Sequence, residues 1–365
     1  MRQKAKFGTA AARWAGVGPY YAMFPSEFAN GVVLRHTSPG DLVIDPFAGR
    51  GTTVFSAAVN RRRGLGVEIN PVGWIYCEAK LRPAAKHLVT ARLTDISAGS
   101  WRYKRAATAL PEFFRWCYDP EVLRFLLAAR SELDWRHRAV DRTAMAFILI
   151  NLHGKRDDSL SNQMRQTKSM SAPYAIQWWR KRGLRPPKVD PLQFLSARIE
   201  WRYAKGRPEE IDGCVYLGDS IRVLPQLQST LLNEKARLLL TSPPYYGITN
   251  YHYDQWLRLW MLGGPPNSHR VQGRHRGKFE DKEKYRRLLT DVFERTKALL
   301  HNDAVIYVRT DRRKLTLDTT VSVLKETFPQ HRLRRRHRPH EKPTQTRLFG
   351  HSDPRLGEID LVLMR

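Results

Sequence analysis

The stretch between residues 41 and 68 constrains the fold of this chain most strongly. An apolar run, Leu42-Val43-Ile44, ends in an acid and two closely spaced glycines, and the small and apolar residues 54–58 follow. This order is typical of a buried strand, a tight glycine turn and a helix. A second short apolar run, at 64–67, ends at Glu68, about 20 residues after the glycines, as in nucleotide-binding α/β folds. The pattern therefore predicts an α/β protein with a doubly wound parallel sheet.

Strand-like runs return only in the second half of the chain. They lie at 214–217, 238–240, 304–308 and 359–363. A helix is expected over 282–300. Between the first two strands and the run at 214–217, Leu, Ala, Phe and Trp recur at helical spacing without strand alternation. We therefore expect one sheet domain, built from residues 1–84 and 209–365, that a helical insertion over 85–208 interrupts.

The charge of the chain indicates its class of partner. It carries 63 Lys+Arg against 35 Asp+Glu, a formal charge of +28 over 365 residues. Such an excess of positive charge is tolerated most easily opposite phosphates. Nucleic acid is therefore the first candidate partner, and an anionic membrane surface is the second. The longest strongly apolar run, Ala144 to Leu152, is far shorter than the roughly 20 residues of a membrane span. The basic N-terminus lacks the apolar block of a signal peptide, so a cytoplasmic protein is expected.

The three cysteines, Cys77, Cys117 and Cys214, lie far apart and form no C-x-x-C pair. This usage favours neither a disulfide framework nor a zinc site, and no metal site is assigned. We expect these thiols to be small buried hydrophobic groups.

The glycine turn is a candidate cofactor site. Backbone N–H groups at a helix start can approach a ligand closely, while the carboxylate of Asp45 holds a positively charged or hydroxylated part of it. The turn is not a P-loop and lacks the third glycine of the dinucleotide fingerprint. Glu68 can accept from a ribose diol, and Asp219, after the third strand, from an adenine amino group. The alternatives are a turn that only reverses the chain, a solvated acid at 68, and a helix N-cap at 219.

A rigid acceptor cluster is predicted at Thr241-Ser242-Pro243-Pro244-Tyr245. Two prolines remove backbone donors and fix φ, so carbonyls and a side-chain oxygen face outward at this strand end. Such acceptors can hold the exocyclic amino group of an extruded base, for which Tyr245 offers a stacking face. A Pro-Pro turn that only leaves a strand is the alternative.

Together these two motifs resemble the amino-methyltransferase family of DNA methyltransferases, which methylate cytosine N4 or adenine N6 with S-adenosylmethionine. The resemblance implies a Rossmann-like methyltransferase sheet and a catalytic tetrapeptide, Ser242-Pro243-Pro244-Tyr245. The cofactor residues that it implies are Phe24, Pro25, Asp45, Pro46, Phe47, Ala48, Gly49, Gly51, Thr52, Thr53, Glu68, Ile69, Asn70, Asp219 and Ser220.

Ser242 favours cytosine N4, because adenine enzymes of this family usually carry Asp or Asn at that position. Adenine N6 methylation is the first alternative, followed by methylation of an RNA base and by a non-catalytic nucleic-acid-binding protein. Carbon-5 methylation is excluded, since it needs a cysteine nucleophile in a Pro-Cys context. In this chain the cofactor motifs precede the catalytic one, opposite to the order common among Ser-Pro-Pro-Tyr enzymes.

The insertion is expected to recognise the target on double-stranded DNA, with a structural lid or dimer surface as the alternative. Amide and guanidinium groups can read base edges, and other basic residues contact phosphates. The predicted DNA-contacting residues are Asn162, Gln163, Arg165, Arg180, Arg182, Arg274, Arg334 and Arg336. No membrane partner is expected. The resemblance implies a restriction-modification role and association with the nucleoid, and leaves a cognate restriction endonuclease and a homodimer open.

Overall fold

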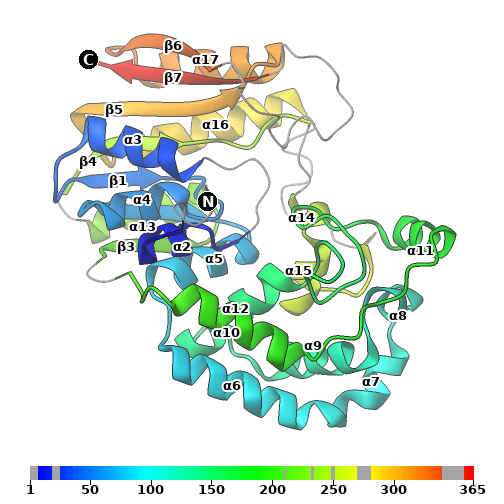
Figure 1. Ribbon diagram of the computed structural model, residues 1–365. Coiled ribbons are helices and arrows are strands. Elements are labelled where there is room, and N and C mark those ends of the chain that lie inside the picture. The colour runs from blue at the N-terminus through cyan, green and yellow to red at the C-terminus, as the bar shows by residue number, and fades with distance from the viewer. Residues whose placement is uncertain are drawn as a thin grey trace. The chain divides into compact units, whose positions relative to one another are not determined.

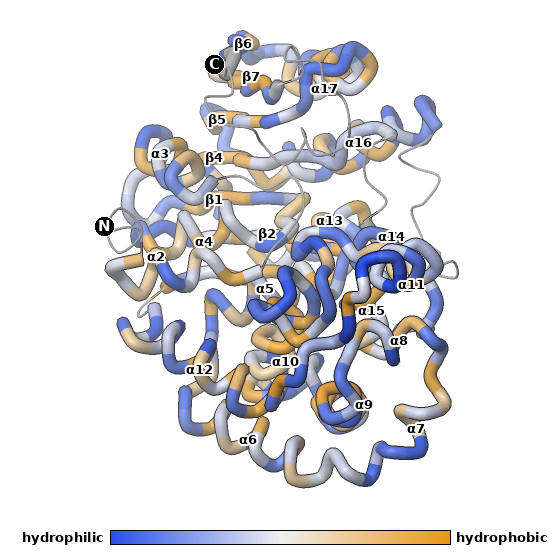
Figure 2. Tube along the Cα trace, turned by 45° about the vertical axis from the view of Figure 1, so that its right-hand side comes forward, coloured by the Kyte–Doolittle hydropathy of each residue, from blue (hydrophilic) through white to orange (hydrophobic). Residues whose placement is uncertain are grey.

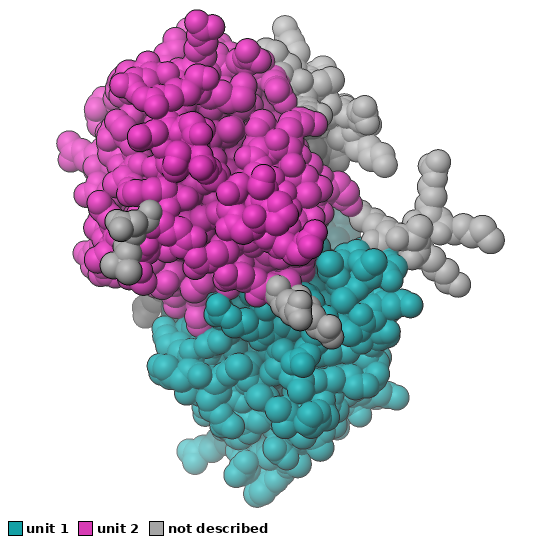
Figure 3. Space-filling model, turned by 90° about the vertical axis from the view of Figure 1, so that its left-hand side faces the viewer, with its two compact units in different colours: residues 1–19, 78–209, 251–273 teal, residues 20–77, 210–250, 274–365 magenta. Residues whose placement is uncertain are grey.

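The computed structural model describes residues 7–18, 25–208, 211–231, 234–247, 251–268, 281–338 and 357–365. The chain divides into two compact units (Figure 3). The sheet unit comprises Tyr20–Cys77, Glu210–Asn250 and Arg274–Arg365. The helical unit comprises Met1–Pro19, Glu78–Glu209 and Tyr251–Gly273, so it holds the expected insertion together with two further segments.

The sheet unit is built on a seven-stranded sheet with the order β3-β2-β1-β4-β5-β7-β6 (Figure 1). The strands are β1 (Leu42–Asp45), β2 (Arg63–Glu68), β3 (Gly213–Leu217), β4 (Ala236–Thr241), β5 (Leu300–Asp311), β6 (Arg332–Arg338) and β7 (Glu358–Met364). The first five strands in this order pair in parallel, and β7 pairs antiparallel with both of its neighbours. The order reverses between β1 and β4, where doubly wound sheets bind ligands. The predicted α/β, Rossmann-like class is confirmed.

Helices cover both faces of this sheet. On one face α3 (Ser26–His36) and α4 (Thr52–Val59) enclose a core with Val43, Leu238 and Leu240. On the other face α13 (Ser220–Thr230), α16 (Lys282–Lys297) and α17 (Lys314–Thr327) pack over Leu42, Ile44 and further strand residues. Successive residues of β1 thus enter opposite cores, because side chains alternate along a strand. Burial on both faces explains why the strands read as continuous apolar runs.

The basic run after residue 331 forms β6, an edge strand that the sequence analysis did not predict. Leu333 packs against the core, whereas Arg334 is exposed and Arg336 half-buried. Figure 2 shows the contrast between hydrophilic β6 and largely hydrophobic β7. Charged side chains on an edge strand hinder pairing with other chains, which gives this run a structural role beside any phosphate contact.

The described part of the helical unit contains helices and a single isolated bridge, Gly154 to Gln163. Its helices are α2 (Ala10–Ala15), α6 (Lys86–Gly99), α7 (Lys104–Ala109), α8 (Glu112–Cys117), α9 (Pro120–Glu132), α10 (Ala139–Asn151), α11 (Ala172–Lys181), α12 (Pro191–Tyr203), α14 (Tyr251–Asp254) and α15 (Trp256–Met261), with a 3₁₀ turn at Ser100–Tyr103. Helix α5 (Pro71–Leu81) connects the two units. Among the described helices none is long and apolar enough to cross a membrane.

Trp14 anchors the N-terminal α2 in the helical unit. Its ring is fully buried, edge-on to Tyr203 at 5.0 Å and to Phe147 at 6.3 Å between centroids. Its Nε1 donates to the carbonyl of Gly206 at 3.0 Å. A buried indole with a satisfied N–H contributes both buried apolar area and a directional hydrogen bond, so α2 has a defined place in this unit.

None of the three cysteines forms a disulfide, and no described group of three or more His, Cys, Asp or Glu is arranged for a metal ion. Cys77 and Cys117 are buried as expected, whereas Cys214 on β3 is partly exposed.

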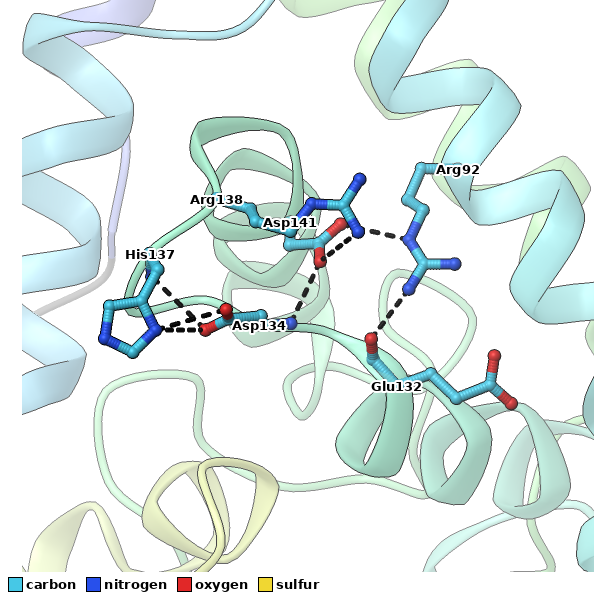
Figure 4. Close-up of polar contacts among 6 residues, drawn as sticks. All are labelled: Arg92, Glu132, Asp134, His137, Arg138 and Asp141. Carbon is cyan, nitrogen blue, oxygen red and sulfur yellow. Dashed lines mark hydrogen bonds and ion pairs between the residues drawn. The ribbon is translucent and has the colours of Figure 1, made fainter.

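A buried carboxylate, Asp141, ties three helices together (Figure 4). From α10 it accepts from Nε of Arg92 on α6 at 3.0 Å and from the backbone N–H of Asp134 at 2.9 Å. Arg92 also donates to the carbonyl of Glu132, at the end of α9, at 2.7 Å. The fully buried charge therefore has both a cationic partner and a backbone donor, which a stable buried ion pair requires.

Replacing Asp141 should destabilise the helical unit. Asp141→Ala leaves the Arg92 guanidinium and the Asp134 N–H without their acceptor, and breaking such a buried pair costs about 3–5 kcal/mol. Calorimetric unfolding should show the loss. Asp134→Ala is the control, because its half-exposed side chain pairs with His137 near solvent, and its effect should be far smaller. Equal losses in the two variants would contradict this account.

Candidate active site

The strand order brings four sequence-predicted groups to one edge of the sheet. Asp219 follows β3, Glu68 ends β2, Asp45 ends β1, and Ser242 follows β4. These strands run in parallel, so their carboxyl ends meet at the same edge. Residues almost 200 positions apart in sequence become neighbours there, as the bond between Asp45 and Thr241 shows.

Asp45 joins the first motif to the catalytic one. Its Oδ1 accepts from the hydroxyl of Thr241 at 2.6 Å and from the backbone N–H of Phe47 at 3.1 Å. Burial raises the pKa of Asp45 to about 6, although hydrogen bonds from Thr241, Thr53 and Phe47 act in the opposite direction. Thr241 directly precedes the tetrapeptide 242–245, so this hydrogen bond fixes the start of the predicted catalytic tetrapeptide against the predicted cofactor motif.

The glycine turn requires its glycines. Gly49 (φ 57°) and Gly51 (φ 73°) both lie in the left-handed region, which side chains disfavour. A Cβ on Gly51 would also lie 2.7 Å from Sγ of Cys77. The chain then enters α4 at Thr52, and the hydroxyl of Thr53 donates to the carbonyl of Leu240 on β4 at 3.1 Å. The turn is therefore more than a chain reversal, because it presents a helix start at the point where the strand order reverses.

Glu68 is buried, so the alternative of a solvated acid is wrong. Its two carboxyl oxygens accept from the backbone N–H groups of Gly49 at 2.6 Å and Asn70 at 2.7 Å. Burial is the main cause that raises its pKa to about 8, and the charge of Asp45 adds to the rise, against those two hydrogen bonds. Glu68 thus braces the glycine turn and is predominantly protonated at neutral pH.

Asn70 offers an unused donor beside Glu68. Its Oδ1 accepts from the Val72 N–H at 3.0 Å, while its Nδ2 is buried and has no hydrogen-bond partner in the described structure. The neighbouring Ile69 exposes 39% of its surface. A buried donor without a partner is costly unless a ligand meets it. This pair of residues therefore fits the polar and apolar parts of a nucleoside.

Asp219 and Ser220 both have structural partners. Asp219 caps α13 by accepting from the Ile221 N–H at 3.1 Å, so the N-cap alternative is present in the structure. Ser220 donates to the carbonyl of Pro46 at 2.5 Å, which ties β3's end to the first motif. Asp219 is only partly buried, and a carboxylate oxygen accepts more than one hydrogen bond, so capping leaves room for a ligand contact.

The remaining cofactor predictions differ in their surroundings. Phe24 lies outside the described residues, and Pro25 is the exposed N-cap of α3. Phe47 packs against the sheet core. Pro46, Ala48 and Thr52 are buried around the turn.

The catalytic motif is held by side chains that the sequence analysis missed. Ser242 is half-buried, and its hydroxyl donates to the Tyr245 oxygen at 3.4 Å. Tyr245 in turn donates to Glu358 at 3.4 Å. Tyr245 exposes only 2% of its surface, so the expected stacking face is covered in this structure. Pro243 and Pro244 are buried as well, which leaves Ser242 as the accessible side chain of the tetrapeptide.

Behind Glu358 lies a buried ion network on β5 and β7. Arg309 binds Asp360 through two hydrogen bonds, at 2.7 and 3.0 Å, and lies 3.5 Å from Glu358. Asp360 also accepts from the Tyr307 hydroxyl at 2.8 Å. The sequence contained a signal for this network, namely Arg309 and Asp360 inside otherwise apolar strands. Charged residues in such positions are rarely buried unless they are paired.

The sequence analysis also assigned no role to Arg50, which lies inside the glycine turn. It exposes 8% of its surface and donates from Nε to the Thr52 hydroxyl at 3.3 Å. Burial lowers its pKa to about 10, so it remains charged at neutral pH.

One predicted base contact is corrected by the structure. Asn162 is fully buried, and its Nδ2 donates to the carbonyls of Trp116 and Leu184 at 3.0 and 3.2 Å. It cannot also reach a base edge, because its amide is enclosed and occupied. Gln163 is half-buried, with its side-chain oxygen accepting from the Arg156 N–H at 2.8 Å.

The other predicted DNA contacts lie at the surface or outside the described residues. Arg165, Arg180 and Arg182 are exposed on the helical unit, and Arg334 and Arg336 are on β6. Arg274 lies outside the described residues.

The comparison with known proteins concerns mainly the first motif. A family model described as DNA methylase, of the N6/N4 type, matches residues 2–73. Type II methyltransferase M.Cfr9I of Citrobacter freundii is 41% identical over 54 residues, or 15% of this chain and 18% of that protein. Orphan methyltransferase M.BamHII of Bacillus amyloliquefaciens is 42% identical over 57 residues, or 16% and 20%. DNA adenine methyltransferase YhdJ of Escherichia coli K12 is 41% identical over 46 residues, or 13% and 16%.

The matched segments span no more than a fifth of these relatives, and the family match ends well before Ser242. Among solved structures, the rRNA methyltransferase aviRa from Streptomyces viridochromogenes aligns over 97% of this chain and 92% of its own, at 14% identity and a TM-score of 0.35. The glycine turn, the strand order and the family match over residues 2–73 agree, and this part of the chain is similar to N6/N4 DNA methylases.

Proposed function

We propose that this chain is an S-adenosylmethionine-dependent DNA methyltransferase that acts on the exocyclic amino group of a flipped base, with cytosine N4 as the first candidate. The observation that carries the proposal is the hydrogen bond between Asp45 and Thr241, which joins the family's glycine turn to the Ser242–Tyr245 motif. A cofactor site and an amino-acceptor site thereby share one sheet edge.

The residues present fit the cofactor. The left-handed glycine turn brings backbone N–H groups to the start of α4, Asn70 has an unpartnered buried donor, and acids lie at the ends of β1 and β2. Asp45 would hold the positively charged methionine end, Glu68 and Asn70 the ribose, and Asp219 the adenine. Arg50, a buried cation at the start of α4, would hold the carboxylate. When bound, S-adenosylmethionine supplies an electrophilic methyl group on its sulfonium.

The catalytic motif would position and polarise the target amine. Ser242 and the carbonyls around the two prolines accept its hydrogens, which orients the nitrogen lone pair toward the methyl group. The reaction needs no covalent enzyme intermediate, and the amine's released proton passes to solvent. Ser242 supports cytosine N4 by the family pattern, and adenine N6 is the second candidate because either base presents an amino group to the same acceptors. An endonuclease partner and a homodimer stay predictions from the resemblance.

Ser242→Ala should lower methyl transfer to duplex DNA by roughly 100-fold or more, on the scale of losing one preorganised polar group at a reacting centre. Cofactor affinity, measured by calorimetry, should stay near the wild-type value because the cofactor residues are untouched. Ser229→Ala, an exposed serine on α13, is the matched control. Nucleoside mass spectrometry of the wild-type product separates N4-methylcytosine from N6-methyladenine. Wild-type turnover by Ser242→Ala would show that the catalytic motif is misassigned.

Cofactor affinity should rise with pH across the pKa of Glu68. In the free protein the pKa of Glu68 is raised to about 8. Ribose hydroxyls that donate to this carboxyl group favour its ionised form, so cofactor binding releases a proton. Calorimetry between pH 6.5 and 9, in buffers of different ionisation enthalpy, measures that release. Glu68→Gln removes the group and should remove the part of the pH dependence that belongs to it. An unchanged profile in Glu68→Gln would assign the dependence to another group.

Arg50→Gln should weaken binding of S-adenosylmethionine but not of its decarboxylated analogue, because only the former carries the anion that we assign to Arg50. A charge-assisted hydrogen bond of this kind contributes about 1.5–3 kcal/mol. Calorimetric titration of both ligands into both proteins gives the comparison. If the wild-type protein binds the two ligands equally well, Arg50 does not contact the carboxylate.

A further inference from the structure

We propose that an exposed basic face of the helical unit, built by α8, α11 and residues 182–188, binds the phosphate backbone of duplex DNA. We call it the α8–α11 face. The proposal rests on the proposed function and adds where the duplex is held. It replaces the buried residue Asn162 with a surface that DNA can reach.

Two arginines of this face lie over one tryptophan. The guanidinium carbons of Arg185 and Arg180 are 4.3 and 5.4 Å from the ring centroid of Trp116 on α8. The indole Nε1 donates to Glu112 at 3.1 Å, and Glu112 also pairs with Arg180. Stacking orients a planar guanidinium while leaving N–H groups at its edge for phosphate oxygens, so these side chains lose less freedom on binding than unsupported ones.

A second stack extends the face. The Arg182 guanidinium carbon lies 4.4 Å from the ring centroid of Trp178. Tyr174, one turn earlier on α11, exposes 56% of its surface. Lys181 and Lys188 are exposed as well, so positive charge far exceeds the single acid, Glu112, that takes part in the stacks. Interleaved aromatic and guanidinium groups with excess positive charge match a polyphosphate chain.

The interior explains why this face keeps its shape. Helix α11 packs against α8, with Trp179 buried at 5.7 Å from the Phe113 ring. The Trp179 indole donates to the carbonyl of Gln163 at 2.7 Å. Asn162 donates to the carbonyl of Trp116, the residue whose ring carries the stack, and to the carbonyl of Leu184, which precedes Arg185. The buried amide thus positions the backbone that carries the face, which accounts for its burial within a segment otherwise rich in exposed polar groups.

Phosphate contact predicts a particular pattern of binding. Side chains that neutralise phosphates position a protein on DNA without reading its sequence, and each such contact contributes about one unit to the slope of log K against log salt. The α8–α11 face should therefore supply affinity that is independent of sequence and sensitive to salt. Duplex DNA is the partner because the proposed reaction modifies a DNA base, and a structured RNA is tested as the competing ligand.

The test measures binding of the full chain to two DNA duplexes of equal length and unrelated sequence and to a structured RNA at several salt concentrations. The double variant Arg180→Ala/Arg185→Ala should lose roughly tenfold or more in affinity for both duplexes, and its salt slope should fall by about 2. Arg180→Lys/Arg185→Lys keeps the charge and should retain most of the slope. Arg136→Ala is the matched control, since it removes an exposed arginine that lies 4.2 Å from the Trp135 ring in the same unit.

The outcomes separate this inference from the proposed function. Wild-type affinity and slope in the double variant, or an equal loss in Arg136→Ala, would overturn the proposed face. A wild-type preference for the RNA that only the double variant loses would overturn DNA as its partner. Cofactor binding and thermal unfolding should be unchanged in the double variant, because both side chains are exposed. The wild type could transfer no methyl group to DNA and still bind duplexes with the predicted salt dependence. The proposed function would then be wrong, and the assignment of the α8–α11 face would remain supported.

Discussion

The parallel pairing of β1 with β4 is the constraint on which the candidate site depends. It sets the end of the first strand beside the end of the fourth, where the Thr241 hydroxyl donates to Asp45 at 2.6 Å. A buried carboxylate needs such donors, because its charge is otherwise unfavourable away from water. The same hydrogen bond that stabilises Asp45 therefore also locates the four residues that follow Thr241.

Around this point the structure holds several buried or partly buried carboxyl groups, each with its own donors. Glu68 accepts hydrogen bonds from two backbone N–H groups. Asp360 accepts from Arg309 and Tyr307, and Glu358 accepts from Tyr245. The predicted catalytic tetrapeptide is held at its start by Asp45, through Thr241, and at its end by Glu358, which lies beside the ion network on β5 and β7. A braced loop suits a reaction that depends on positioning rather than on a strong nucleophile.

The segment that follows the catalytic motif belongs to the helical unit. There the fully buried Arg258 donates to the carbonyls of Leu149 and Gln166 at 2.9 and 2.6 Å, and Trp256 donates to Met170 at 3.0 Å. These bonds fasten α15 to α10 and to the loop that follows it. Residues 251–273 of the helical unit thus follow the predicted catalytic tetrapeptide closely in the sequence.

The sequence by itself determined the places of six of the seven strands of the sheet, the glycine turn and the Pro-Pro motif after β4, because short-range patterns specify them. Runs such as Leu42–Ile44 need burial on both faces, Gly51 needs a left-handed turn, and two prolines remove donors beside Ser242. Sequence reasoning missed β6, because its run of arginines resembles a solvated charged segment until β7 pairs with it. It also missed Glu358 and Arg309, and it misread Asn162 as a base contact. Only the tertiary structure decided these roles, because whether a polar side chain is enclosed or presented to solvent depends on which distant segments pack against it.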